Sequence, residues 1–117
     1  MKAVLYARSA CTTQESEATL ESQLEALRNQ ANRQGMEIIE EFRDGGYSGL
    51  RLPRPGLDRM RELAQRSGFD VLLTCGPDRL ARDSVLLDRI LQELAQLGIR
   101  TLFLEGRAKE EDLAWGR

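Results

Sequence analysis

Apolar and polar positions follow two alternating patterns along the chain. Short, nearly continuous apolar runs are typical of buried strands, whereas apolar residues repeating every three or four positions are typical of amphipathic helices. The first pattern predicts strands at residues 2–7, 36–42, 69–75 and 99–104. The second predicts helices at residues 17–34, 55–66 and 82–97, and residues 108–115 are compatible with the start of another helix.

Strands and helices that alternate in this way predict one α/β domain over residues 1–117. Right-handed crossovers then give a three-layer fold, with a mostly parallel sheet of at least four strands and helices on both faces. The run at 69–75 is the most apolar, so it should be central, whereas the charged run at 36–42 should lie at an edge. Gly35 and Gly98 follow the first and the last helix and are expected to end them.

Composition excludes several classes of function. The chain has no histidine, so histidine-based triads and metal sites are not possible. The two cysteines, Cys11 and Cys75, are too few for a thiolate cage and are expected to be buried or half-buried apolar residues. No apolar run approaches the roughly 20 residues that span a bilayer, and the N-terminus has no signal-peptide pattern. We therefore expect a cytoplasmic protein that does not enter a membrane and has no metal site.

Charge is distributed unevenly although its sum is small. The formal net charge is −2, from 17 basic and 19 acidic residues, so general attraction to nucleic acid is not expected. Residues 41–82, however, carry eight arginines and no lysine. Guanidinium groups make the planar, paired hydrogen bonds that suit phosphate or carboxylate, which directs attention to this part of the chain.

Several of these side chains follow predicted strands. In a parallel sheet, ligands bind beyond the carboxyl ends of the strands. If residues 78–82 begin a helix, Asp78 is its favoured N-cap residue, and Arg79 and Arg82 share a face near its N-terminus. A bound anion would offset the repulsion between these two cations. Together with residues at the other strand ends, they predict a phosphate or phosphodiester site, and the residues concerned are Tyr6, Arg8, Arg54, Asp78, Arg79 and Arg82.

The same residues carry a resemblance to a known family. Tyr6-Ala7-Arg8, Gln23, Ser48-Gly49 with Arg54-Pro55-Gly56, and Asp78-Arg79-Leu80-Ala81-Arg82 occur in an order and spacing similar to those of the serine recombinases, the resolvase/invertase family. The resemblance covers nearly the whole chain and corresponds to the family's N-terminal catalytic domain. The YxR and DRLxR segments are specific when they occur together, whereas the SG…RP segment only supports them.

The resemblance implies a resolvase-like fold and a reaction on DNA. A serine hydroxyl would attack a phosphodiester and form a 5′-phosphoserine link, without metal or nucleotide cofactor. Arg8, Arg79 and Arg82 would hold the scissile phosphate, and Asp78 would orient them or take part in proton transfer. The remaining residues that the resemblance implies support the site or the DNA backbone, and they are Gln23, Tyr6, Ser48 and Arg54.

One position departs from the family pattern. The nucleophile of the YxRxS pattern falls on Ala10, which has no hydroxyl. Ser9 is the nearest alternative, but on a regular strand it faces away from Arg8 unless the chain turns there. Two interpretations follow: an active recombinase with Ser9 as displaced nucleophile, or a silent relative that binds DNA phosphate or dimerises.

The resemblance also implies partners. A homodimer that assembles into a tetramer at synapsis is expected, with DNA as substrate and no small-molecule substrate. No long helix and no helix-turn-helix pattern follows residue 104, so the region that reads the DNA sequence is expected outside this chain. A response-regulator-like signalling domain is a weaker alternative, because Tyr6 and Arg8 stand where that class needs acidic residues.

Overall fold

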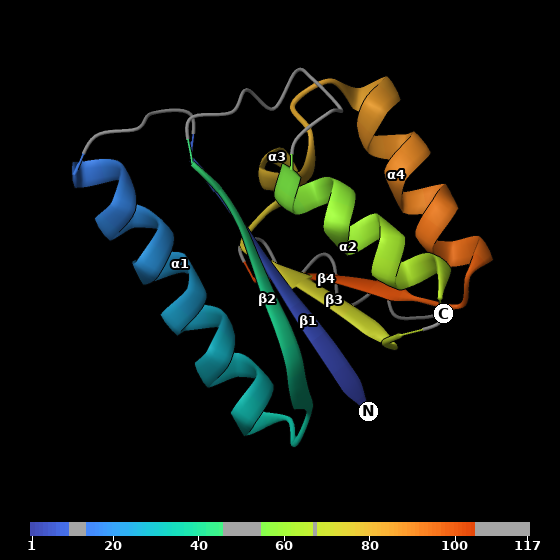
Figure 1. The fold of residues 1–117 in the computed structure, drawn as a ribbon, viewed down its shortest axis with the longest axis horizontal. Coiled ribbons are helices and arrows are strands. Elements are labelled where there is room, and N and C mark those ends of the chain that lie inside the picture. The colour runs from blue at the N-terminus through green and yellow to red at the C-terminus, as the bar shows by residue number, and fades with distance from the viewer. Residues whose placement is uncertain (10–13, 46–54, 67, 105–117) are drawn as a thin grey trace.

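The computed structural model describes residues 1–9, 14–45, 55–66 and 68–104 of the 117 residues (Figure 1). Strands and helices alternate along these residues, as the hydrophobic pattern predicts. In chain order they are β1 (Lys2–Ser9), α1 (Gln14–Arg33), β2 (Glu37–Gly45), α2 (Pro55–Gln65), β3 (Val71–Thr74), α3 (Pro77–Leu80), α4 (Ser84–Gln96) and β4 (Arg100–Phe103).

The four strands form one sheet in the order β2-β1-β3-β4. Each neighbouring pair is parallel, which confirms the predicted α/β class. β2 lies at an edge and β3 lies inside the sheet, as their composition indicates. β1 is the most deeply placed strand, and residues 3–7 are fully buried. Its carboxyl end extends past its pairing with β3, which stops where Tyr6 lies beside Thr74.

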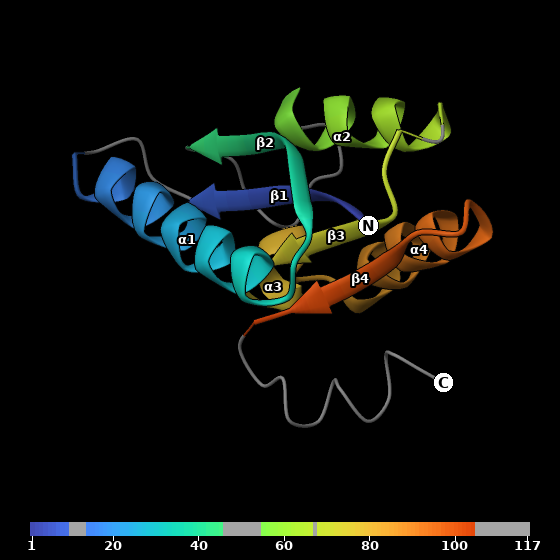
Figure 2. The ribbon, with the colours of Figure 1, turned by 90° about the horizontal axis from the view of Figure 1, so that it is seen from below.

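Helices cover both faces of the sheet and give the predicted three layers (Figure 1). α1 packs its apolar side, including Leu24 and Leu27, on the face that carries Leu5 and Ala7. The opposite face is packed by side chains of α2, α3 and α4 in a second apolar cluster. Figure 2 shows α1 and α2 on opposite sides of β1 and β2. Successive side chains of β1 therefore pack alternately against α1 on one face of the sheet and against α2, α3 and α4 on the other.

The segment after β3 differs from the prediction. A separate turn, α3, spans Pro77–Leu80, and the following helix begins at Ser84 rather than at residue 82. Ala81 is extended, with φ −162° and ψ 143°, and this interrupts the helical path. The N-cap of α4 is Asp83, whose side chain accepts a hydrogen bond from the Val85 N–H at 2.9 Å. An aspartate is a strong N-cap, so it sets the start of the helix locally.

Two predictions about this segment are therefore wrong. Asp78 is not an N-cap, because Gly76 holds that position in α3 and Asp78 lies inside the turn. Arg79 and Arg82 do not share the N-terminal face of one helix, because the chain is extended between them. Sequence spacing alone could not distinguish Asp78 from Asp83 as the capping residue.

The glycine stops and the buried thiol agree with the sequence analysis. Gly35 and Gly98 have φ of 69° and 81°, the left-handed conformation that commonly ends a helix. Cys75 is 5% exposed, so its thiol is buried. Cys11 and the predicted helix at 108–115 lie outside the described residues. Within the described part of the chain, none of the helices has the length and apolar character needed to cross a membrane.

Candidate functional site

Arg8 joins the end of β1 to the turn that follows β3. Its side chain is almost completely buried, at 3% exposure. The guanidinium donates through Nε to the Arg79 carbonyl at 3.2 Å and through Nη2 to the Asp78 carbonyl at 2.8 Å. Carbonyl groups at the end of a helical turn have no partner within the turn, so a guanidinium satisfies them well. Arg8 therefore fixes α3, and with it the Arg79 backbone, beyond the carboxyl end of the sheet.

Gln23 of α1 fixes the backbone of Arg8. The Arg8 N–H donates to Gln23 Oε1 at 3.3 Å, and Gln23 Nε2 donates to the Arg8 carbonyl at 3.1 Å. The pairing of β1 with β3 has already ended at Tyr6 and Thr74, so Arg8 lies just beyond that ladder. The Gln23 amide, itself 6% exposed, thus bonds both polar groups of the Arg8 backbone. Gln23 is a positioning residue in this geometry.

Tyr6 and Asp44 connect β1 and β2 to the start of α2. The Tyr6 hydroxyl donates to Asp44 Oδ2 at 2.7 Å. The same carboxylate accepts the Gly56 N–H at 2.6 Å and the Leu57 N–H at 3.0 Å. It therefore caps α2 from another element, at the end of the helix where a negative charge is favourable. Asp44 is 2% exposed, so these three donors replace the water it has lost.

A side chain at Gly56 would not fit beside this carboxylate. A Cβ there would lie 2.8 Å from the Arg43 carbonyl oxygen and 2.9 Å from Asp44 Oδ1. Glycine at this position therefore allows the helix N-terminus to approach β2 closely.

Asp44 is the supporting residue that sequence reasoning missed. A signal was present, because residue 54 before α2 is an arginine, which is not a capping residue. A helix without a local cap needs an acceptor from elsewhere, and Asp44 is the acidic residue at the end of the preceding strand. Tyr6 is fully buried and bonded to Asp44, so it contributes to the site by positioning rather than by an exposed hydroxyl.

The other predicted site residues differ in their exposure. Arg79 is partly buried on α3, and the Asp78 and Arg82 side chains are exposed at the same end of the sheet. Ser9 is the last residue of β1 and is 8% exposed. Ser48, Arg54 and Ala10 lie outside the described residues.

Arg8 and Ser9 point to opposite faces of the sheet. Tyr6 belongs to the apolar cluster of α2, α3 and α4, and Ala7 belongs to that of α1. β1 remains a strand through Ser9, which pairs with Gly45 of β2. Because side chains alternate along a strand, Arg8 faces α3 and Ser9 faces the α1 side. The turn after Arg8 that would bring the Ser9 hydroxyl beside the guanidinium is not present in β1.

The arrangement defines a class of protein. A parallel sheet with arginines at its carboxyl end suits an anionic ligand such as a phosphate. Comparison with known proteins gives the family. Residues 3–116 match the sequence profile of the "Resolvase, N terminal domain" family. The chain belongs to this family, the catalytic domains of serine recombinases.

Individual relatives agree with this assignment. The chain is 33% identical over 89 residues to the "Putative DNA recombinase" of Bacillus subtilis (strain 168), a match that covers 76% of this chain and 17% of that protein. The chain therefore spans about a sixth of the length of this relative.

Two solved structures have the same fold. One is the C-terminal catalytic domain of ISC1926 TnpA, an IS607-like serine recombinase, with a TM-score of 0.82, 27% identity, and coverage of 96% of this chain and 74% of that one. The other is a resolvase family site-specific recombinase from Streptococcus pneumoniae, with a TM-score of 0.79, 26% identity, and coverage of 92% and 74%. These similarities support the resolvase-like fold predicted from the sequence.

Proposed function

We propose that this chain binds a backbone phosphate of DNA beside Arg8, Arg79 and Arg82. The observation that carries the proposal is the pair of hydrogen bonds from the buried Arg8 guanidinium to the carbonyls of residues 78 and 79. They hold α3 against the end of β1, so the backbone that carries the Arg79 side chain is fixed. A preorganised cation loses less conformational entropy on binding than a mobile one does.

We further propose that the chain, as its sequence stands, holds the phosphodiester without attacking it. The family pattern puts its nucleophile at Ala10, and Ser9 is 8% exposed on the face opposite Arg8. A hydroxyl must lie within about 3–3.5 Å of the phosphorus and in line with the leaving oxygen to attack it. While Ser9 remains paired with Gly45, strand alternation turns its side chain away from the Arg8 guanidinium. The silent interpretation is therefore the one that the geometry favours.

The alternative is cleavage through Ser9, and one observation favours it. Ser9 directly follows Arg8 and ends β1, so local fraying of the strand end would change the orientation of its side chain. Its oxygen would then form a bond to phosphorus while the bond to the 3′ oxygen breaks. The serine proton would leave to solvent, and Asp78 would protonate the departing 3′ oxygen. The product would be a 5′-phosphoserine link with a free 3′-hydroxyl, which the reverse step rejoins without a nucleotide cofactor.

A trapping experiment separates these two interpretations. The protein is incubated with a pool of nicked suicide duplexes, and covalent protein–DNA adducts are mapped by mass spectrometry. We expect DNA binding without an adduct. An adduct at Ser9 that disappears in Ser9→Ala would establish the active alternative instead.

Removing the guanidinium of Arg79 or of Arg82 should weaken DNA binding. We expect Arg79→Ala or Arg82→Ala to lower the affinity for a short duplex about 10- to 30-fold, because each removes a charge-assisted hydrogen bond worth roughly 1.5–2 kcal/mol. Each variant should also reduce the slope of log affinity against log salt by about one. Fluorescence anisotropy at several salt concentrations measures both quantities.

Arg100→Ala is the matched control for this prediction. Arg100 is exposed and begins β4, so it lies at the amino end of the sheet, away from the proposed site. It should change the affinity by less than about twofold and leave the salt slope unchanged. Equal losses in all three variants would indicate non-specific attraction and would contradict the proposed site.

The remaining functional assignments are proposals from the family. We propose that the protein forms a homodimer, that it contributes to a tetramer when DNA sites pair, and that it acts in the cytoplasm, where DNA is available. Ser48 and Arg54 are proposed to contact the DNA backbone. Binding of DNA by residues 1–117 alone should be weak and sensitive to salt, since few phosphate contacts are available.

A further inference from the structure

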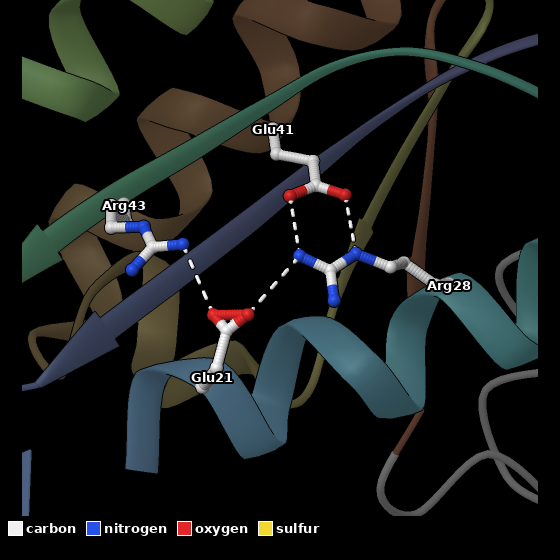
Figure 3. A network of polar contacts seen from close by, with 4 residues as sticks. All are labelled: Glu21, Arg28, Glu41 and Arg43. Carbon is white, nitrogen blue, oxygen red and sulfur yellow. Dashed lines mark hydrogen bonds and ion pairs between the residues drawn. The ribbon is translucent and has the colours of Figure 1, made fainter. Parts of the chain in front are cut away.

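Four charged side chains form a network between α1 and β2 (Figure 3). Arg28 of α1 donates to both carboxylate oxygens of Glu41 of β2, at 2.6 Å and 2.8 Å. Glu21 of α1 pairs with Arg28 at 3.4 Å and with Arg43 of β2 at 3.2 Å. The network therefore crosses from the helix to the strand at two places.

The network joins segments of α1 and β2 that also carry two supports of the proposed phosphate site. Glu21 is two residues before Gln23, whose amide bonds the Arg8 backbone. Arg43 directly precedes Asp44, which caps α2 and accepts the Tyr6 hydroxyl. A shift of α1 along β2 would move the Gln23 amide away from Arg8. The paired contact between Arg28 and Glu41 opposes such a shift, because two parallel hydrogen bonds fix direction as well as distance.

The Arg28–Glu41 pair is the most strongly coupled part of the network. Hydrogen bonding to the Arg28 guanidinium holds the pKa of Glu41 below its ordinary value, against the opposing effect of partial burial. Both side chains are about one-third exposed, at 34% and 28%. The carboxylate is therefore ionised at neutral pH, and the pair is present under the conditions in which DNA is bound.

We propose that Arg28 is a positioning residue of the phosphate site, acting through Glu41 and the placement of α1 to keep the Gln23 amide on the Arg8 backbone. Arg28 need not contact DNA, and the expected effect of its loss on DNA binding rests on the proposed function. The expected effect of its loss on the Arg8 backbone does not rest on that function. A simple stabilising role would instead lower the stability of the whole fold and leave the Arg8 contact as protected as the rest of the sheet.

A second ion pair in this protein provides the matched control. Arg61 of α2 donates to Glu93 Oε1 of α4 through two nitrogens, at 3.1 Å and 2.7 Å. The Arg61 and Glu93 side chains are similarly half-buried, at 28% and 21% exposure, and this pair also joins two separate elements. It does not involve α1 or β1. Arg28→Gln and Arg61→Gln thus remove comparable interactions at different distances from Gln23.

The experiment compares amide hydrogen exchange in these variants. We expect Arg28→Gln to speed exchange of the Arg8 N–H about tenfold relative to buried amides of β3, because its acceptor is the Gln23 side chain. Arg28→Lys should give an intermediate effect, since an ammonium group cannot make the paired contact. Arg61→Gln should change exchange at Arg8 only as much as in β3. Affinity for the short duplex should fall about three- to tenfold in Arg28→Gln and less than twofold in Arg61→Gln.

The exchange rate of the Arg8 amide and the affinity for DNA can each fail to change independently of the other. Unchanged relative exchange at Arg8 in Arg28→Gln, or the same change in Arg61→Gln, would overturn the positioning role. Faster exchange at Arg8 with unchanged DNA affinity would support the coupling between Arg28 and Gln23 and contradict the proposed phosphate site. If Arg28→Gln lowers overall stability too far for comparison, Glu41→Gln removes the same contact from the strand side and is read in the same way.

Discussion

Ala10→Ser is expected to convert the protein from a DNA binder into one that forms a covalent link to DNA. The substitution supplies a hydroxyl at the position where the family pattern has its nucleophile, two residues after Arg8. Loss of a nucleophile commonly lowers a covalent reaction by a factor of about 10⁶, so its return should raise adduct formation from undetectable to readily measured. Gel shift under denaturing conditions detects the adduct, and mass spectrometry maps it to position 10.

Two further variants test whether the arginines take part in this reaction. In the Ala10→Ser background, Arg79→Ala or Arg82→Ala should abolish the adduct while leaving the circular dichroism spectrum unchanged, because phosphoryl transfer depends on stabilising the charge of the transition state. Ser9→Ala in the same background should leave the adduct in place. An Ala10→Ser protein that binds DNA normally and forms no adduct would contradict this view of the site.

Asp44→Ala is expected to lower the free energy of unfolding by about 3 kcal/mol. The substitution removes the acceptor of three buried or partly buried donors, the Tyr6 hydroxyl and the Gly56 and Leu57 N–H groups. Each donor left without a partner costs roughly 1 kcal/mol or more, and the released desolvation cost of the carboxylate offsets part of the total. Urea unfolding followed by circular dichroism measures the change.

Tyr6→Phe is the control for the Asp44 prediction. It removes one of the three donors but keeps the ring in the apolar cluster, so the loss should be about 1 kcal/mol. The difference between the two variants then reports the cap on α2. An Asp44→Ala protein within 0.5 kcal/mol of the unchanged chain would mean that water replaces the carboxylate at the helix N-terminus.

Local patterns in the sequence were sufficient for most of the fold. The alternation of apolar runs with helical spacing predicts all four strands, and the charge content of residues 36–42 places that strand at the edge. The exception is the segment after β3, where two aspartates five residues apart both suit an N-cap. Asp83 is the one that caps, because the chain becomes extended at Ala81 and the helix restarts after it.

The supports of the site depend on contacts between distant residues, which local patterns do not reveal. Arg8 is 70 residues from the carbonyl of Asp78, and Asp44 is 13 residues from the Leu57 N–H that it accepts. The sequence motifs identify Arg8 and Gln23 as important but do not indicate that Gln23 bonds the Arg8 backbone. Likewise, alternation along a strand predicts that Ser9 faces away from Arg8, but only the pairing of Ser9 with Gly45 excludes a turn between them.

The supports and the chemistry of the site are therefore separable in this protein. Arg8, Gln23 and Asp44 maintain the end of the sheet through buried hydrogen bonds that do not require a hydroxyl at position 10. Under the proposed function, a chain with alanine at position 10 keeps both its fold and its phosphate-binding surface.

The most direct test of the central claim follows the arginine Nε–H signals by nuclear magnetic resonance while a short DNA duplex is added. We expect the signals of Arg8, Arg79 and Arg82 to shift together and to saturate with one dissociation constant, while those of Arg61 and Arg100 remain in place. Shifts confined to arginines elsewhere, or shifts of Arg79 and Arg82 with different dissociation constants, would contradict a single phosphate site at this end of the sheet.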